Sequence, residues 1–412
     1  MRIKSCRLCG NLPTETDVNL GILSNTGFFP RNSQDEVFSA RLDLVRCEEC
    51  DLVQLGEDID TAKLFTSEHY GYSSSLNDSM VFHLEMLARE IKQCIRGTVN
   101  PKYLDIGSND GTLLNHSLKI MPDLKAVGID PTLPLWEENY DERITKIPNF
   151  FSSEIIKSFG INEFDIVTSI SMFYDLKNPL EFAKEVSEIL KIGGIWILEQ
   201  SYLPIMLRKN SFDTICHEHL EYYNLTSLTY VLHHAGFSVN SIVFNDINGG
   251  SVRVIAQKSG KPEVAIRAEL HRIIQSEVNS KREDFGLRMF MARVKNLRDE
   301  VKSKIDEVNR EGKLVIGLGA STKGNTLLQY FDFSEKDLKY IEEINPRKHG
   351  RLTPGSHIPI CLESLMKDQK VPDVKLVLPW HFKDNILKKQ NSYLMNGGAL
   401  FFPLPEFQQM SN

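Results

Sequence analysis

The densest group of titratable side chains lies between residues 212 and 223, in the segment Phe-Asp-Thr-Ile-Cys-His-Glu-His-Leu-Glu-Tyr-Tyr. His217, Glu218 and His219 stand next to one another, and Tyr222 follows three residues later. A histidine of near-neutral pKa beside a carboxylate is a typical general base. Two other interpretations stay open. One is a His-x-His metal site, although the sequence offers no obvious third ligand and no HExxH spacing. The other is a pair of hydrogen-bonded histidines in a polar loop.

A glycine loop occupies residues 104–113, Leu-Asp-Ile-Gly-Ser-Asn-Asp-Gly-Thr-Leu, and reads as a strand, a turn and the start of a helix. Such a turn suits a dinucleotide, S-adenosylmethionine (SAM) or a tight connection alone. A dinucleotide site requires G-x-G-x-x-G and binds the diphosphate on free helix N–H groups. Here Asp105 and Asp110 bracket the loop. Their carboxylates repel a diphosphate and favour the sulfonium and ammonium groups of SAM.

Asp130 lies at the end of the next predicted strand, where an acid accepts hydrogen bonds from both ribose hydroxyls. Together with the glycine loop it favours SAM over the other occupants. The predicted SAM-binding residues are Asp105, Gly107, Ser108, Asn109, Asp110, Gly111, Asp130, Pro131, Ser171 and Met172.

A methyl acceptor determines which side chains a SAM site needs beside it. Oxygen and nitrogen acceptors already carry lone pairs, so that positioning does much of the work. A carbon acceptor first loses a proton, most easily beside a carbonyl group, and the resulting enolate then needs stabilisation. A histidine and a glutamate of this segment for proton removal, with tyrosine hydroxyls that donate to the enolate oxygen, would suit this task.

Four of the seven cysteines form two C-x-x-C pairs, Cys6 with Cys9 and Cys47 with Cys50. Two such turns make a closed shell of four thiolates, which suits a structural zinc ion with no open coordination position. Two unrelated pairs of buried cysteines are the alternative. A thioredoxin-like redox pair requires only one C-x-x-C and a βαβ context. The sequence therefore predicts a zinc-stabilised N-terminal segment.

A second glycine loop, Gly-Leu-Gly-Ala-Ser-Thr-Lys-Gly-Asn-Thr at residues 317–326, also follows a predicted strand and opens a helix. It differs from the NTPase P-loop because Lys323 precedes the second glycine and Asn325 follows it. Free N–H groups and one lysine still make an anion site, and we expect a diphosphate there; a tight turn alone is the alternative. The predicted substrate-binding residues are Ser321, Thr322, Lys323, Gly324, Asn325, Arg351, Asn248 and Gly249.

The elements that must position these residues divide the chain into three parts: a zinc-binding domain over 1–68, a SAM domain over 69–260, and a helical linker with a smaller Rossmann-like domain over 261–412. An amphipathic helix is expected over 77–96. Short β-rich runs then alternate with helical ones from 102 to 258, which predicts a doubly wound α/β sheet ending in an antiparallel hairpin. One or two long helices are expected over 263–310, and a second α/β pattern follows from 313.

The composition is that of an ordinary globular protein, with 41% hydrophobic and 25% charged residues among 412. The net charge of −7 argues against a broad nucleic-acid surface. No apolar run approaches the length of a membrane helix, and residues 1–6 contain no apolar signal segment. We therefore expect a cytoplasmic protein that binds a small molecule and neither nucleic acid nor membrane. A monomer is compatible with these features.

The order of motifs along the whole chain resembles the nucleotide-sugar C-methyltransferase family, which makes branched deoxysugars such as mycarose, noviose or tetronitrose. The motifs are C-x-x-C…C-x-x-C, D-x-G-x-x-x-G, F-D-T-I-x-H-E-H, N-G-G-S, G-A-S-T-K-G-N-T and L-T-P-G-S-H-I-P-I. The resemblance implies a zinc-bearing N-terminal domain, a class I SAM domain and a C-terminal domain that helps to hold the nucleotide-sugar. It implies methylation of a carbon beside the keto group of an NDP-4-keto-deoxysugar.

The resemblance also assigns roles. His219 is implied as the base, Glu218 as a carboxylate that orients it or shares the proton, and His217 as a member of the same motif without an assigned role. Tyr70 and Tyr72 match an aromatic stretch that faces the sugar.

Two positions depart from the family pattern. Cys216 stands where a tyrosine is common, and Asp175 where some relatives carry a histidine. Tyr174 and Tyr222 are candidates to replace the lost groups. Two other functions compete with this one: a SAM-dependent O- or N-methyltransferase, and a zinc-ribbon interaction protein with a vestigial SAM fold. The acidic SAM loop and the His-Glu-His run argue against the second.

Overall fold

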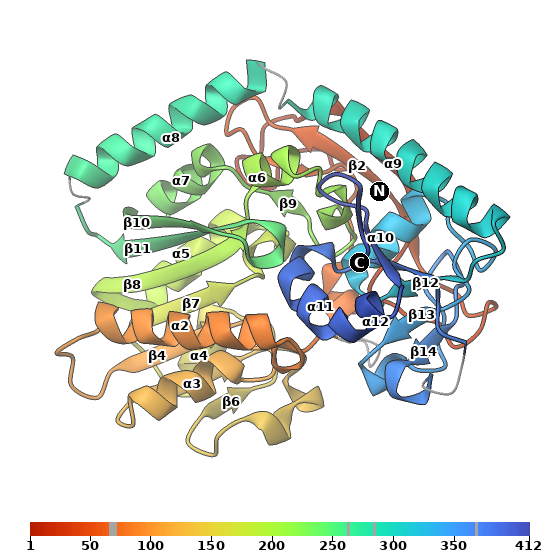
Figure 1. Cartoon of the computed structure of the whole chain (residues 1–412). Helices are drawn as coiled ribbons and strands as arrows, with labels where there is room; N and C mark the ends of the chain where they lie inside the picture. Colours follow the sequence, from red (N-terminus) through yellow and green to blue (C-terminus); the bar gives the residue numbers. More distant parts are fainter. Residues whose placement is uncertain (66–71, 262–263, 283–285, 367–369) are drawn as a thin grey trace.

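The computed structural model describes residues 1–65, 72–261, 264–282, 286–366 and 370–412 (Figure 1). Within these residues the strands form three sheets, of four, seven and six strands. Each sheet belongs to one of the three parts expected from the sequence, except that one strand crosses from the central part into the N-terminal sheet.

The central sheet has the strand order β10-β11-β8-β7-β4-β5-β6. The five neighbouring strands β8, β7, β4, β5 and β6 pair in parallel. Strand β11 lies between β8 and β10 and runs antiparallel to both. This is the class I methyltransferase sheet, and the predicted doubly wound pattern with its terminal hairpin is confirmed. Its strands are β4 (Lys102–Ile106), β5 (Lys125–Ile129), β6 (Thr145–Ile147), β7 (Phe164–Ile170), β8 (Leu190–Ser201), β10 (Phe237–Asn245) and β11 (Ser251–Lys258).

Helices cover both faces of this sheet, which explains why its strands are apolar on both sides. Helices α2 and α3 bury one face together with Tyr103 and Ile166, whereas α4, α5 and α7 bury the other with Leu104 and Trp196. The amphipathic helix expected over 77–96 is α2, and the side chain of Asn77 caps it by accepting from the Ser79 N–H. The helices of this region are α2 (Asp78–Cys94), α3 (Thr112–Ile120), α4 (Ser153–Ser158), α5 (Pro179–Ile189), α6 (Leu203–Arg208) and α7 (Leu225–His234).

The N-terminal sheet is antiparallel and has the order β1-β2-β3-β9. Its first three strands come from the cysteine-rich segment, and alternate residues such as Val18, Leu42 and Leu55 are buried in its core. The fourth strand, β9, follows His219 directly along the chain. The elements are β1 (Thr14–Ser24), β2 (Ser39–Arg46), β3 (Val53–Leu55), β9 (Glu221–Tyr222) and the short helix α1 (Thr61–Phe65).

The C-terminal sheet has the order β14-β13-β12-β15-β16-β17 and is parallel except for its last strand. The expected second α/β pattern is present. The helix that the second glycine loop opens begins at Thr322, and the Ser321 side chain caps it by accepting from the Gly324 N–H. The elements are β12 (Val315–Leu318), α10 (Thr322–Tyr330), β13 (Ile341–Glu343), β14 (Ile360–Leu362), β15 (Val374–Val377), α11 (Lys383–Lys389), α12 (Asn391–Met395), β16 (Ala399–Phe402) and β17 (Gln408–Met410).

Two long helices, α8 (Val264–Arg282) and α9 (Leu287–Arg310), connect the central and C-terminal parts, and Gly286 precedes the first residue of α9. Figure 1 shows α8 lying over the central part and α9 over the other two. One apolar core joins Leu44 of the N-terminal sheet, Val294 of α9 and Leu376 of the C-terminal sheet. The N- and C-terminal parts therefore share a core.

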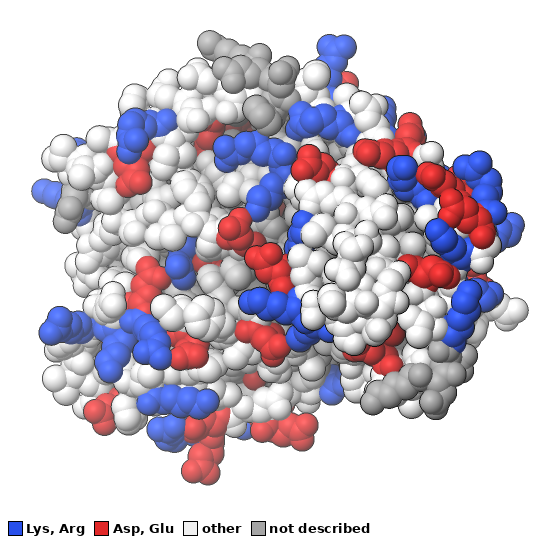
Figure 2. Space-filling view, viewed as in Figure 1, with Lys and Arg blue, Asp and Glu red and all other residues white. Residues whose placement is uncertain are grey.

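None of the helices in the described ranges is both long and apolar enough to cross a membrane. Figure 2 shows acidic and basic side chains interspersed on the visible face.

Candidate active site

A cavity of about 780 Å³ lies between the three parts of the molecule. Its walls are the carboxyl-terminal ends of β4, β5 and β7, the loop around Gly27, the loop 216–219, and the ends of β12 and β13. Open α/β sheets bind ligands at this edge, where the chain leaves neighbouring strands in opposite directions. Two sheets thus direct their binding edges into one space.

The SAM-type loop forms one wall. All of its predicted residues line the cavity except Gly111, which starts α3 with a φ of +75° and packs against the Tyr140 ring. The Asp130 carboxylate accepts hydrogen bonds from the Asn109 N–H at 2.8 Å and from the Thr132 N–H at 2.6 Å. These bonds hold the ends of β4 and β5 together at the cavity edge.

The charges of this wall fit a cationic ligand. Burial raises the pKa of Asp105 to about 7 and also raises the pKa of Asp130. Within the described residues, no lysine or arginine forms an ion pair with either carboxyl group. Burial acts to raise the pKa of Asp110 too, but hydrogen bonds from Ser73 and Thr112 lower it. The acidic wall therefore fits the sulfonium and ammonium groups of SAM and disfavours a diphosphate.

His219 lines the cavity from the loop 216–219, and its orientation differs from the expected one. Its Nδ1 contacts the carbonyl oxygen of Thr214 at 2.8 Å, so that Nδ1 carries the proton and Nε2 has the free lone pair. Within the described residues, no hydrogen bond joins His219 to Glu218. A backbone carbonyl, and not the neighbouring carboxylate, therefore orients the ring. The Tyr174 ring packs against it at a centroid distance of 4.2 Å.

The electrostatic surroundings of the two acid–base residues differ. Burial, with a contribution from Lys323, lowers the pKa of His219 to about 3, so its imidazole is neutral at pH 7. Burial raises the pKa of Glu218 to about 7, against the opposing effect of Lys348. Asp175 also lines the cavity, and burial and the charge of Glu218 raise its pKa well above the usual range. Burial therefore favours the protonated form of Glu218 and the neutral form of His219.

The other residues of the predicted catalytic set occupy different places. Tyr72 lines the cavity and is 45% exposed, whereas Tyr70 lies outside the described residues. Tyr222 is buried in β9 opposite Val53 and does not line the cavity, so its expected contact with an enolate is not supported. His217 is also buried away from the cavity, because its ring points to the N-terminal sheet.

The second glycine loop forms a third wall, to which Ser321, Thr322 and Lys323 contribute. The Lys323 ammonium donates to the backbone oxygen of Asn248 at 2.6 Å, and Asn248 lines the cavity as well. These residues present the N-terminus of α10 and one cation to the cavity.

Four residues predicted to bind the substrate do not line the cavity: Gly249, Gly324, Asn325 and Arg351. The Asn325 amide donates to the Thr26 oxygen at 2.8 Å, and the Arg351 guanidinium to the Phe29 oxygen at 3.0 Å. Both side chains hold a loop of the N-terminal part, a role that motif spacing does not reveal.

Cavity residues that the sequence did not suggest include Lys348, His381 and Phe29. The Lys348 ammonium lies 4.5 Å from the Phe29 ring centroid and donates to the Ala320 oxygen at 2.6 Å. These three residues come from separate loops without a recognisable motif.

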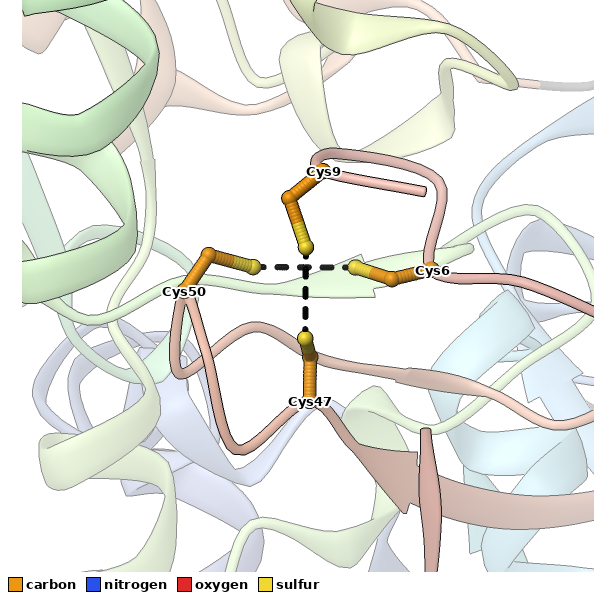
Figure 3. Close-up of side chains that lie close together, drawn as sticks. All are labelled: Cys6, Cys9, Cys47 and Cys50. Atoms are coloured by element: carbon orange, nitrogen blue, oxygen red, sulfur yellow. Dashed lines mark hydrogen bonds between the residues drawn. The ribbon is translucent and has the colours of Figure 1, made fainter. Parts of the chain in front are cut away.

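The zinc site lies away from this cavity, and Figure 3 shows its four cysteines pointing toward one another. Cys47 and Cys50 lie in the turn between β2 and β3. The sulfur atoms of all four cysteines lie within 4.8 Å of one another. Sγ of Cys6 is 3.6 Å from Sγ of Cys50, and Sγ of Cys9 is 3.3 Å from Sγ of Cys47. Bonds of about 2.3 Å to a tetrahedral zinc ion place sulfurs about 3.8 Å apart. The four thiols thus fit a closed structural zinc site.

Comparisons with known proteins match three successive segments of the chain. A zinc binding domain model matches residues 6–65, a methyltransferase domain model residues 82–242, and a C-methyltransferase C-terminal domain model residues 246–405. The chain is also similar to the C-methyltransferase NovU of Streptomyces niveus, with 28% identity over 408 residues that cover 98% of this chain and 96% of that protein.

Among solved structures, the plantazolicin methyltransferase BpumL is 14% identical, with a TM-score of 0.37 over 49% of this chain and 92% of that chain. The pyocyanin biosynthetic protein PhzM is 16% identical, with a TM-score of 0.34 over 43% of this chain and 56% of that chain. These scores are too low to carry an argument, so the assignment depends on the strand order, the family models and NovU. The chain therefore carries, in this order, a zinc-binding domain, a SAM-dependent methyltransferase domain and a C-methyltransferase C-terminal domain.

Proposed function

We propose that this C-methyltransferase acts on a carbon next to the keto group of an NDP-4-keto-deoxysugar, in the biosynthesis of a branched deoxysugar. The observation that supports this proposal most is the shared cavity. The SAM-type wall, the acid–base residues Glu218 and His219, and the α10 N-terminus with Lys323 all border one space of about 780 Å³. Pockets of about 300 Å³ already hold a small ligand, so this volume has room for a cofactor and a second molecule.

Proton removal is assigned to His219. Its Nε2 accepts the proton from the carbon beside the carbonyl group, and the electron pair of the broken C–H bond moves onto the carbonyl oxygen as an enolate. Because Thr214 holds Nδ1–H, the lone pair of Nε2 has a fixed direction. Bound SAM supplies an electrophilic methyl group, which the enolate carbon takes while S-adenosylhomocysteine (SAH) is left.

Glu218 then shares the proton. An imidazole with a pKa of about 3 is a weak acceptor, whereas the Glu218 carboxylate has a pKa of about 7 and lines the same cavity. We assign donation to the enolate oxygen to a tyrosine of the cavity wall, Tyr72 or Tyr174, because Tyr222 does not border the cavity.

The nucleotide end of the substrate is assigned to the C-terminal part. Ser321 and Thr322 lie at the start of α10, where free N–H groups and the helix dipole favour a diphosphate, and Lys323 adds a positive charge. The domain boundaries that we propose, 1–68, 69–260 and 261–412, assign zinc binding, SAM binding and nucleotide binding to separate parts.

The test is incubation with methyl-labelled SAM and a panel of NDP-4-keto-6-deoxysugars, followed by location of the label by NMR. We expect the label on a carbon adjacent to the keto group. The matched controls are the same nucleotide-sugars with the keto group reduced to a hydroxyl, which cannot form an enolate and should remain unmethylated. A label on oxygen or nitrogen, or equal turnover of the reduced sugars, would contradict the enolate mechanism.

A further inference from the structure

The loop that carries Glu218 and His219 belongs to the central part by sequence, but the zinc-binding domain holds it. Directly after His219, the Leu220 oxygen accepts a hydrogen bond from the Leu55 N–H at 2.9 Å. The chain then forms β9, which pairs antiparallel with β3 through Val53 and Tyr222. The segment that leaves the acid–base residues is therefore a strand of the zinc-binding sheet.

His217 provides a second attachment at the other side of Glu218. Its side chain is fully buried, and its Nε2 donates to the Leu23 oxygen, at the end of β1, at 3.0 Å. The Phe38 ring meets the imidazole edge-on at a centroid distance of 6.0 Å. Both partners belong to the zinc-binding domain, and the side chain of His217 does not border the cavity. His217 thus contacts this domain and cannot take part in the chemistry directly.

Gly27 provides a third contact. A Cβ atom built at this position would overlap with Oε1 of Glu218, so that glycine leaves the space into which the carboxylate extends. The backbone of Gly27 has no positive φ, which means that alanine fits this position except for the Glu218 side chain. The Asn25 side chain accepts from the Gly27 N–H at 3.1 Å and fixes the loop there.

We propose that His217 and Gly27 are positioning residues, through which the zinc-binding domain sets the places of Glu218 and His219 at the cavity wall. This inference rests on the proposed function, because it concerns the same acid–base pair. It gives the zinc-binding domain a task in methyl transfer besides its own folding. A displacement of about 1 Å at a reacting group costs on the order of 100-fold in rate, so the attachment matters for turnover.

The first test compares His217→Ala with His217→Gln. The glutamine amide reaches about as far as Nε2 and can still donate to the Leu23 oxygen, whereas alanine cannot. We expect His217→Ala to lower kcat on the keto sugar about 10- to 100-fold with unchanged SAM affinity in calorimetry. His217→Gln should restore most of kcat. A kcat near wild type in His217→Ala would overturn the inference.

A matched control separates positioning from general loss of stability. Leu42 is fully buried in the core of the same sheet and has no part in the loop, so Leu42→Ala should lower the Tm through its cavity while kcat remains near wild type. If Leu42→Ala lowers kcat as much as His217→Ala at an equal loss of Tm, His217 is a structural residue only.

A second measurement needs no substrate. Hydrogen–deuterium exchange of the zinc-loaded protein should become faster over 214–222 in His217→Ala, without change over the SAM loop 105–111. Unchanged exchange over 214–222 would overturn the inference, even if no turnover of a substrate can be measured.

Gly27→Ala tests the same idea with little risk to folding, because only the flexible end of Glu218 must move. We expect a lower kcat with unchanged zinc content, Tm and SAM affinity; an unchanged kcat would contradict the role of Gly27. Failure of the proposed function looks different. In that case His219→Ala itself would retain turnover, whatever His217 and Gly27 do.

Discussion

Glu218 and His219 are neighbours in the chain, yet burial shifts their proton affinities in opposite directions. The pKa of the imidazole falls to about 3 and that of the carboxyl group rises to about 7. Burial disfavours the charged form of each group, which is cationic for histidine and anionic for glutamate. The carboxylate is therefore the stronger base of the two.

At the scale of single residues, His219→Ala should abolish methyl transfer and leave SAM affinity near wild type, because His219 is not one of the residues that form the acidic SAM wall. With SAH in place of SAM, the wild-type protein should also exchange the hydrogen beside the keto group for deuterium from D2O, and the variant should not. The exposed His234 gives the control His234→Ala, which should keep both activities. Loss of SAM affinity in His219→Ala would contradict the assignment of the base.

Turnover should depend on pH through Glu218. Because the pKa of its carboxyl group is about 7, the carboxylate is protonated below this pH and no longer accepts the proton. We expect kcat to fall about tenfold per pH unit well below pH 7 and to level off above it. In Glu218→Gln, kcat should be low and this inflection should be absent. An inflection near 7 that persists in the variant would assign it to another group.

At the scale of elements, the sequence predicted those parts whose chemistry is local. The strands, glycine turns and helix starts around Asp105 and Thr322 follow from residues that lie within one turn of each other. The hydrogen bonds of the Asn325 and Arg351 side chains could not be predicted, because the accepting oxygens of Thr26 and Phe29 belong to a loop that is distant in the sequence. The placement of Tyr222 in the N-terminal sheet is a long-range pairing of the same kind.

Zinc binding by the two C-x-x-C turns, Cys6 with Cys9 and Cys47 with Cys50, can be tested directly. Elemental mass spectrometry should find about one zinc ion per chain, since four thiolates close the coordination shell. Cys47→Ser should lose the zinc and lower the Tm, because the two turns that the metal joins anchor β2 and β3. Cys94→Ser should retain both properties, since Cys94 lies in α2 outside the cluster. A zinc-free protein with an unchanged Tm would contradict the site.

The α10 N-terminus allows a separate test of the nucleotide end. Lys323→Ala should raise the KM for the nucleotide-sugar about 10- to 100-fold, which corresponds to the loss of one charge-assisted contact, and should change SAM affinity less. The exposed Lys336 lies in the same domain and gives the control Lys336→Ala, with KM near wild type. An unchanged KM in Lys323→Ala would place the diphosphate elsewhere.

At the scale of the whole molecule, three domains with separate family models do not make three independent folding units. The apolar core of the zinc-binding sheet continues through α9 into the C-terminal sheet, from Leu44 past Val294 to Leu376. The sequence showed the three parts and their motifs. It did not show this shared core, because amphipathic patterns reveal which face is buried and not which element covers it.

A fragment of residues 1–260 should therefore expose the part of this core that Leu44 and Val53 form. We expect it to aggregate, or to lack a cooperative thermal transition in calorimetry and near-UV circular dichroism. The full chain should unfold its N- and C-terminal parts in one transition. A monomeric fragment 1–260 with a sharp transition would show that the two parts are energetically separate.

The pairing of β3 with β9 also has a consequence for synthesis on the ribosome. The strands β1 to β3 and all four zinc ligands leave the ribosome early, but the strand that completes their sheet arrives only with Glu221 and Tyr222. Until then β3 presents an unpaired edge, which is prone to pair with other chains. Early zinc binding would hold the nascent sheet in register until β9 pairs with the edge of β3. Chains made without zinc should therefore aggregate during translation more than after it.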